Sequence, residues 1–163
     1  MEMKIAPMPA EFLERVRTTG IDDQGQPVER MLAEGGEPCR DVLRRARAGE
    51  SLILASFSPF DRANPYKEFG PVFVLAEPDG TEPVQNVLPT NGETPYLRER
   101  FVLRAYSSGQ TIVDAELVDA ARGEETARRL LERTDVAWVD ARFPAYGCFA
   151  LRITRAGAVT ASA

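Results

Sequence analysis

The fold is decided by residues 101–133, which read FVLRAYSSGQTIVDAELVDAARGEETARRLLER. Apolar and polar side chains alternate over residues 101–106 and again over 111–117, and this period of two is typical of β-strands. The short polar segment 107–110 lies between the two runs. We therefore expect residues 101–117 to form a β-hairpin.

A helix is predicted directly after this hairpin, at residues 123–133. Ala127, Leu130 and Leu131 have the spacing of one apolar helix face. Two glutamate–arginine pairs in the same segment are separated by four residues, in the orientation that favours a helix.

The rest of the chain adds more strands than helices. We expect a short helix at 9–16, strands at 28–33, 52–57, 71–76, 136–142 and 148–154, and loops at 21–27, 58–69 and 77–95. Residues 40–48 fit either a helix or one arm of a hairpin with 52–57, and we favour the hairpin. The whole pattern predicts an α+β protein, a mostly antiparallel sheet with one or two packed helices.

Length and composition predict one domain over residues 1–163, with a core at about 28–155 and a flexible tail at 156–163. The apolar content of 44% and the charged content of 28% are those of an ordinary globular protein. A net charge of −5 argues against a nucleic-acid partner, because binding phosphates requires a basic surface.

The chain also gives no sign of export or of a membrane partner. Its N-terminus lacks the pattern of a signal peptide, and its apolar runs are too short to span a bilayer. We therefore expect a cytoplasmic protein, in which Cys39 and Cys148 are free thiols.

The complete absence of histidine limits the possible chemistry. It excludes Ser–His–Asp and Cys–His pairs and the usual zinc sites, and nucleotide-binding glycine patterns are missing as well. Asp114, Glu116 and Asp119 could bind a hard cation, although an acidic exposed edge is the favoured interpretation. We predict no metal and no cofactor.

The last predicted hairpin carries the candidate site. Side chains alternate across a strand, so Cys148 and Arg152 share one face of the final strand. If the turn at 143–147 sets Arg142 opposite Cys148, Asp140 faces Ala150 and Trp138 faces Arg152. This face then collects a thiol, two guanidinium groups, a carboxylate and the only tryptophan.

Such a face could bind an anion. Arg142 and Arg152 could hold a carboxylate or phosphate by paired hydrogen bonds, beside Asp140 and with Trp138 as a stacking platform. A cation near Cys148 favours its thiolate, which would make this cysteine a candidate catalytic nucleophile. The alternative interpretation is a buried structural cysteine on a packed or solvated strand face.

Three other residues belong to the candidate ligand-binding set. Cys39 and Arg40 are adjacent, so on a strand they point to opposite faces. If Cys39 lies near Cys148, the two thiols could form a reversible dithiol pair. Tyr66, in the predicted loop 58–69, could close over a pocket, or it could be a surface anchor.

Several short stretches run in an order that resembles a known family. They are Pro38-Cys39-Arg40, Gly49-Glu50 with Leu52, Leu54, Ser56 and Phe57, Tyr66, Gly70-Pro71-Val72-Phe73-Val74, Arg104 and Tyr106, Ile112-Val113-Asp114-Ala115, Val136-Ala137, and Gly147-Cys148-Phe149 with Arg152. Over about residues 28–155 the chain resembles the bacterial domain-of-unknown-function family 1203. The resemblance implies a compact bacterial protein and assigns no activity. Members often carry a histidine where Asp140 stands here, which argues against an imidazole-dependent role.

The sequence therefore favours a small cytoplasmic protein that binds a small anionic ligand in a pocket lined by arginine and cysteine. Two alternatives stay open. One is a non-catalytic interaction module or homodimer that uses a sheet face or edge. The other is a redox protein that uses Cys39 and Cys148.

Overall fold

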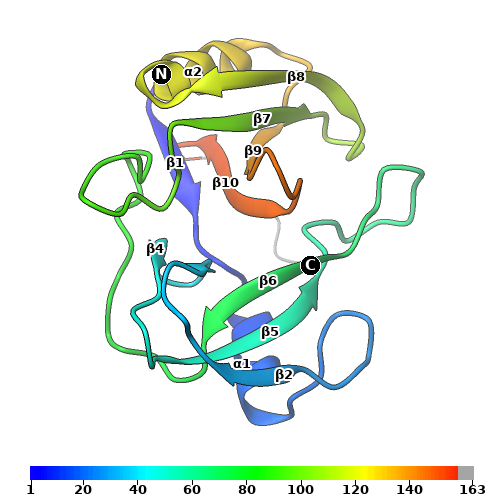
Figure 1. Cartoon of the computed structure of the whole chain (residues 1–163). Helices are drawn as coiled ribbons and strands as arrows, with labels where there is room; N and C mark the ends of the chain where they lie inside the picture. The colour runs from blue at the N-terminus through cyan, green and yellow to red at the C-terminus, as the bar shows by residue number, and fades with distance from the viewer. Residues whose placement is uncertain (158–163) are drawn as a thin grey trace.

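The chain folds into two five-stranded sheets, as shown by a computed structural model that describes residues 1–157 (Figure 1). The first sheet has the order β1 (Met3–Ala6), β10 (Phe149–Arg155), β9 (Trp138–Arg142), β7 (Arg100–Tyr106) and β8 (Ile112–Asp119). The second has the order β2 (Glu29–Leu32), β5 (Ser51–Phe57), β6 (Gly70–Leu75), β3 (Pro38–Cys39) and β4 (Arg44–Arg45). The strand pairs are antiparallel, apart from the parallel pair of β3 and β6. The predicted α+β class with mostly antiparallel sheets is confirmed.

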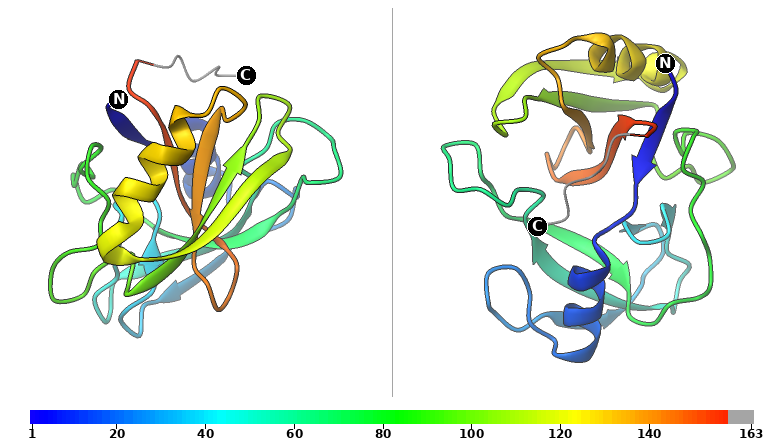
Figure 2. Two further views of the ribbon diagram at one scale, coloured as in Figure 1. Left: turned by 90° about the horizontal axis from the view of Figure 1, so that it is seen from above. Right: turned by 180° about the vertical axis from the view of Figure 1, so that it is seen from behind.

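The first sheet is covered by helix α2 (Gly123–Glu132), which a 3₁₀ turn (Ala120–Arg122) joins to β8. Figure 2 shows this helix lying across the strands. Its predicted apolar face is buried, and Leu130 and Leu131 pack with Val139 of β9 and Ile153 of β10 in the largest hydrophobic cluster. The predicted hairpin of β7 and β8 and the predicted helix are both confirmed.

The second sheet packs against helix α1 (Ala10–Thr18), close to the helix expected at residues 9–16. Phe12 and Val16 of α1 join Ile53 and Phe57 of β5 in a second hydrophobic cluster. Phe149 of β10 enters the same cluster, with its ring centroid 5.3 Å from that of Phe57. This aromatic contact ties the two sheets together.

Residues 40–48 form neither the helix nor the favoured hairpin with 52–57. They follow β3 into a tight turn and return as β4, while β5 pairs with β2 and β6. Leu43 has φ of 50°, a left-handed conformation that ends any helix at this point. Hydrogen bonds between Ala33 and Glu50 and between Gly49 and Ala33 close the end of the β2–β5 hairpin. The segment between them is therefore an excursion from that hairpin.

The register expected for the β9–β10 hairpin is also wrong. Arg142 lies opposite Phe149, and Asp140 lies opposite Arg152, with a bulge between Phe149 and Leu151. The extra residue, Ala150, is buried in the first cluster instead of lying on the polar face. A bulge interrupts the alternation of side chains, so Phe149 before it faces the second sheet, whereas Leu151 after it faces the first cluster.

The loops expected at residues 58–69 and 77–95 lack helices and strands. The flexible tail expected at 156–163 lies mostly outside the described residues. Within residues 1–157, every helix is too short or too polar to cross a membrane.

Candidate functional site

A small pocket lies between the two sheets, where the turn of the β9–β10 hairpin meets the loop at 58–69 and the start of β6. Its volume is about 170 Å³. The lining residues come from both sheets and from this loop: Phe57, Pro59, Glu68, Phe69, Gly70, Pro71, Arg142, Tyr146, Gly147, Cys148 and Phe149. The structure thus brings Arg142 and Cys148, two of the predicted site residues, to the wall of one cavity.

Arg142 is the buried cation of this pocket. Its side chain is only 4% exposed. One terminal nitrogen, Nη1, donates a hydrogen bond of 3.0 Å to the carbonyl oxygen of Gly147 in the hairpin turn. The other, Nη2, contacts the carboxylate of Glu68. Neither Nη2, despite this contact, nor Nε makes a hydrogen bond within residues 1–157.

Arg152, the other predicted anion contact, is engaged by the protein itself. Its Nε and Nη2 donate to the two carboxylate oxygens of Asp140 at 2.8 and 3.0 Å. Nη2 also donates to the carbonyl oxygen of Pro59 at 2.8 Å. The guanidinium group stacks over Trp138, 4.4 Å from the ring centroid. These contacts fix the loop that begins at Ser58 onto the first sheet.

Cys148 is partly exposed, and its cationic neighbour is Arg40. Nη2 of Arg40 lies 3.5 Å from the sulfur atom. The same side chain donates to the carbonyl oxygens of Phe149 at 2.9 Å and Pro38 at 2.7 Å. The Arg40 side chain therefore links the second sheet to the first and contacts Cys148 in the pocket wall.

The side chains of Cys39 and Arg40 point to opposite sides of the second sheet, as alternation predicted. Cys39 is fully buried with Val42, Ala46 and Leu52 in a third hydrophobic cluster. Burial raises the pKa of its thiol to about 12. Both thiols are free. Cys39 and Tyr66 are absent from the pocket wall, and Tyr66 lies on the exposed part of the loop.

Of the eleven lining residues, the sequence analysis had proposed only Arg142 and Cys148; the residues it missed include Glu68, Phe69 and Tyr146. Glu68 and Phe69 end the long loop directly before Gly70-Pro71, and Tyr146 lies in the turn before Gly147. Their proximity to Arg142 depends on how the loop and the turn fold over each other. In the sequence, Phe69 and Tyr146 each precede a glycine, and this pattern was a weak signal of a pocket rim.

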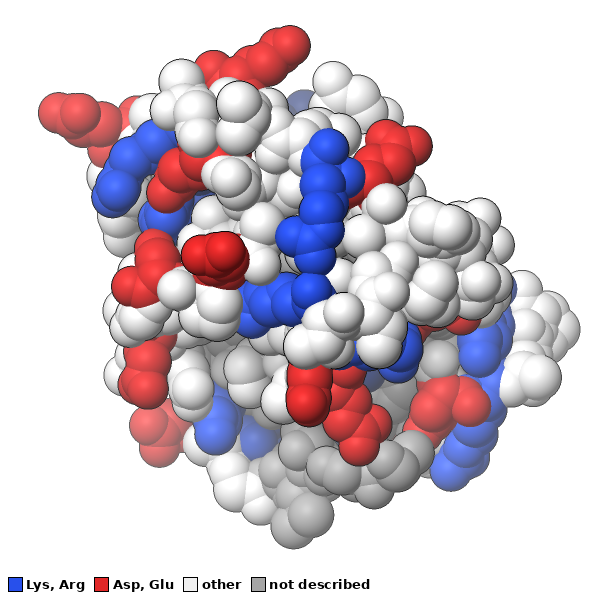
Figure 3. Space-filling model, turned by 90° about the horizontal axis from the view of Figure 1, so that it is seen from below, with Lys and Arg blue, Asp and Glu red and all other residues white. Residues whose placement is uncertain are grey.

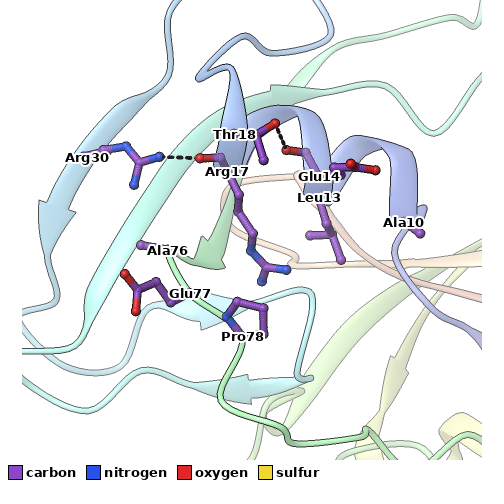
Figure 4. Close-up of a pocket in the computed structure, with 9 residues that line it drawn as sticks. All are labelled: Ala10, Leu13, Glu14, Arg17, Thr18, Arg30, Ala76, Glu77 and Pro78. Atoms are coloured by element: carbon purple, nitrogen blue, oxygen red, sulfur yellow. Dashed lines mark hydrogen bonds between the residues drawn. The ribbon is translucent and has the colours of Figure 1, made fainter.

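A second, larger pocket of about 630 Å³ lies between α1 and the end of β6 (Figure 4). Its two arginines bind acceptors of the protein. Arg17 donates to Leu75 O at 3.2 Å and to the carboxylate of Asp41 at 2.7 Å, and Arg30 donates to Arg17 O at 2.9 Å. The arginines of this open pocket therefore already have hydrogen-bond acceptors, whereas Arg142 has nitrogens without one among the described residues.

Charged side chains of both signs share the face of the molecule that Figure 3 shows. Figure 3 looks from the side on which α1 and β2 lie, and basic and acidic side chains are interspersed on this face. Asp114, Glu116 and Asp119 of β8 each pair with an arginine, namely Arg133, Arg129 and Arg100. Among residues 1–157, no cluster of three metal-ligating side chains is found.

Comparison with known proteins gives a family and no activity. A family model described as a protein of unknown function, DUF1203, matches residues 36–155. That range contains every residue of the pocket wall. No curated protein and no solved structure matches the chain.

Proposed function

We propose that this chain, which belongs to the DUF1203 family of proteins of unknown function, binds a small anionic ligand through Arg142 in the pocket between its two sheets. Two free thiols agree with a reducing compartment, so the proposed location is the cytoplasm.

One observation carries the proposal: the buried guanidinium group of Arg142 lines a cavity, and its Nε and Nη2 atoms make no hydrogen bond within the described residues. Nε and Nη2 of an arginine project side by side and match the two oxygens of a carboxylate or phosphate. In Arg142 only Nη2 has an anionic neighbour, and Nε has no acceptor among the described residues. Buried polar groups are almost always hydrogen-bonded, so unpartnered donors on a residue that lines a cavity support a ligand acceptor at this place.

The partner that Arg142 already has is easily replaced. Glu68 belongs to the long loop, and its side chain is 40% exposed. The exposed carboxylate of Glu68 keeps much of its hydration and can return to water at little cost, whereas the buried charge of Arg142 requires another anion in its place. An incoming anion can therefore take the place of the Glu68 carboxylate, and the buried charge of Arg142 stays compensated.

Arg142 and Arg40 differ in what they offer a ligand. Arg40 already makes three contacts with the protein and is buried behind Cys148. In this proposal Arg40 positions the wall, Cys148 forms part of it, and Arg142 binds the anion. Reactivity of the Cys148 thiol is a separate prediction.

Titration calorimetry at low ionic strength tests the proposal, with acetate and phosphate as the ligands. The wild-type protein should bind at least one of them, and Arg142→Lys should weaken that binding about tenfold or more, because lysine cannot make the paired contact. Arg30→Lys, in the other pocket, is the matched control and should bind like the wild type. Equal affinities of Arg142→Lys and Arg30→Lys would refute the proposal, as would the failure of every small anion tested, benzoate included, to bind the wild type.

The alternative functions have less support. The large exposed apolar side chains, such as Leu32 on β2 and Leu117 on β8, lie on different sheets, which does not favour one interaction face. A dithiol pair is not favoured either, because Cys39 packs on the strand face opposite the one from which Arg40 reaches Cys148.

A further inference from the structure

We infer that the preferred ligand of the Arg142 pocket is a planar aromatic carboxylate, which displaces Glu68 and stacks against the aromatic rim. This inference rests on the proposed function and adds the chemical class of the ligand. Its support comes from the arginine edge, the second partner of Glu68, the aromatic wall and the cavity volume.

The arginine edge favours a planar, two-oxygen group. The neighbouring pair of Arg152 and Asp140 shows this geometry within the same sheet, with Nε and Nη2 each bound to one carboxylate oxygen. Arg142 presents the same two atoms, and although Glu68 contacts Nη2, neither atom makes a hydrogen bond within residues 1–157. A carboxylate that enters the cavity directly can satisfy both nitrogens, which Glu68 does not do from its place on the loop.

Glu68 has another arginine to bind when it leaves. Its carboxylate oxygen Oε1 lies 3.4 Å from Nη1 of Arg104 on β7, in addition to its contact with Arg142. A shift toward Arg104 would keep Glu68 paired. The exchange therefore leaves each of the three charged side chains with a partner.

The wall of the cavity is aromatic to an extent that a small inorganic anion would not require. Phe57 and Phe149 form its inner part, and Phe69 and Tyr146 form its rim. Phe69 is 44% exposed and Tyr146 is 90% exposed. Exposed aromatic side chains beside a cavity that has a polar base are typical of sites for flat, partly apolar ligands.

The volume limits the ligand to about one ring. An apolar cavity of about 150 Å³ can hold a benzene molecule, and the pocket measures about 170 Å³. Drug-sized ligands occupy roughly 300–1,000 Å³. A single aromatic ring with one carboxylate therefore fits, and a nucleotide does not.

Benzoate is the probe, with three comparison compounds that each remove one feature. Calorimetry should give an affinity for benzoate at least tenfold above that for acetate, which lacks the ring. Cyclohexanecarboxylate, which is not planar, should bind more weakly than benzoate, and benzamide, which has no charge, should not bind measurably. Equal affinities of benzoate and acetate, or of benzoate and cyclohexanecarboxylate, would overturn the inference.

Two tyrosine variants test the rim without disturbing the core. Tyr146→Ala should weaken benzoate binding about threefold to tenfold, the usual effect of losing one aromatic contact, and should leave acetate binding unchanged. Tyr66→Ala, also an exposed tyrosine but outside the wall, is the matched control and should change neither. Unchanged benzoate binding in Tyr146→Ala would count against stacking at the rim.

Glu68→Gln tests the exchange. Removal of the competing carboxylate should raise the affinity for benzoate by up to about fivefold, the range of a surface ion pair. Glu77→Gln, an exposed glutamate in the other pocket, should leave it unchanged. Weaker binding in Glu68→Gln would mean that Glu68 supports the site and is not displaced.

These outcomes separate the inference from the proposed function. If acetate or phosphate binds through Arg142 and benzoate is no tighter, the ligand class is wrong and the anion site stands. If none of the anions binds the wild-type protein, both fail.

Discussion

Asp140 accepts two hydrogen bonds from Arg152, one from Nε at 2.8 Å and one from Nη2 at 3.0 Å. Arg142, two residues along the same strand, has a carboxylate at Nη2 but no acceptor at Nε within residues 1–157. The sequence predicted both arginines as anion contacts. Of the two, only Arg142 has an Nε–H group without an acceptor in the described part of the chain, and this group is free to bind a ligand. The protein itself occupies Arg152, and the proposed anion site is therefore assigned to Arg142.

We predict that Asp140→Asn destabilises the protein by about 2–3 kcal/mol, because Asp140 is fully buried and its loss leaves the Arg152 charge without a partner. The effect should fall at or below the low end of the range for buried pairs, since Arg152 is partly exposed. Chemical unfolding would measure it. Asp135→Asn breaks an exposed pair with Arg133 and should cost less than about 1 kcal/mol. Equal effects of the two variants would contradict a structural role for Asp140.

We also predict that the two cysteines differ in reactivity. At pH 8 a thiol reagent should label Cys148 first, because Cys148 is partly exposed whereas burial keeps Cys39 protonated, with a pKa of about 12. Mass spectrometry of the labelled peptides would distinguish them, and a denaturant should make both react. A saturating anion should slow the labelling of Cys148, which lines the pocket. Equal native-state rates for the two thiols would contradict the structure.

The ion pair of Arg44 and Glu50 should make stability depend on acid pH. Two hydrogen bonds from Arg44, at 2.8 and 2.9 Å, lower the pKa of Glu50 from 4.5 to about 2. A carboxyl group whose pKa is lower in the folded state stabilises the protein above its unfolded pKa, and this contribution is lost as the pH falls. The window is therefore about pH 4.5 to 2.

The matching experiment compares the wild type with Glu50→Gln across this window. At pH 6 the wild type should be more stable by about 0.5–1 kcal/mol, because the pair is partly exposed and screened. The difference should shrink toward pH 2, where the carboxyl group becomes protonated. A difference in unfolding free energy that stays constant from pH 6 to pH 2 would refute the link.

Local periodicity was enough to predict most elements of the fold. The alternation in β7 and β8 and the helical spacing of Leu130 and Leu131 depend on a side chain and its near neighbours, which a sequence shows directly. The excursion at residues 40–48 was missed because it depends on the left-handed turn at Leu43 and on pairing across the sheet.

The candidate site was predicted only in part, and the reason is the bulge in β10. Arg142 and Cys148 were expected opposite each other on one strand face; both line the pocket, although Arg142 lies opposite Phe149. The bulge shifts Arg152 opposite Asp140 and so removes it from the ligand set, which a sequence with regular alternation cannot show. The partners Glu68 and Arg40 come from distant segments, and only the folded chain brings them to the pocket.

The most direct test of an anion site at Arg142 is NMR spectroscopy of the arginine Nε–H groups during a titration with acetate and then benzoate. The Nε–H of Arg142 is buried and has no acceptor among residues 1–157, so its resonance should move downfield as the ligand binds, and it should saturate with the ligand. The Nε–H of Arg152, already bound to Asp140, should stay in place. Movement of the Arg152 resonance with none at Arg142, or saturation of neither, would contradict the account.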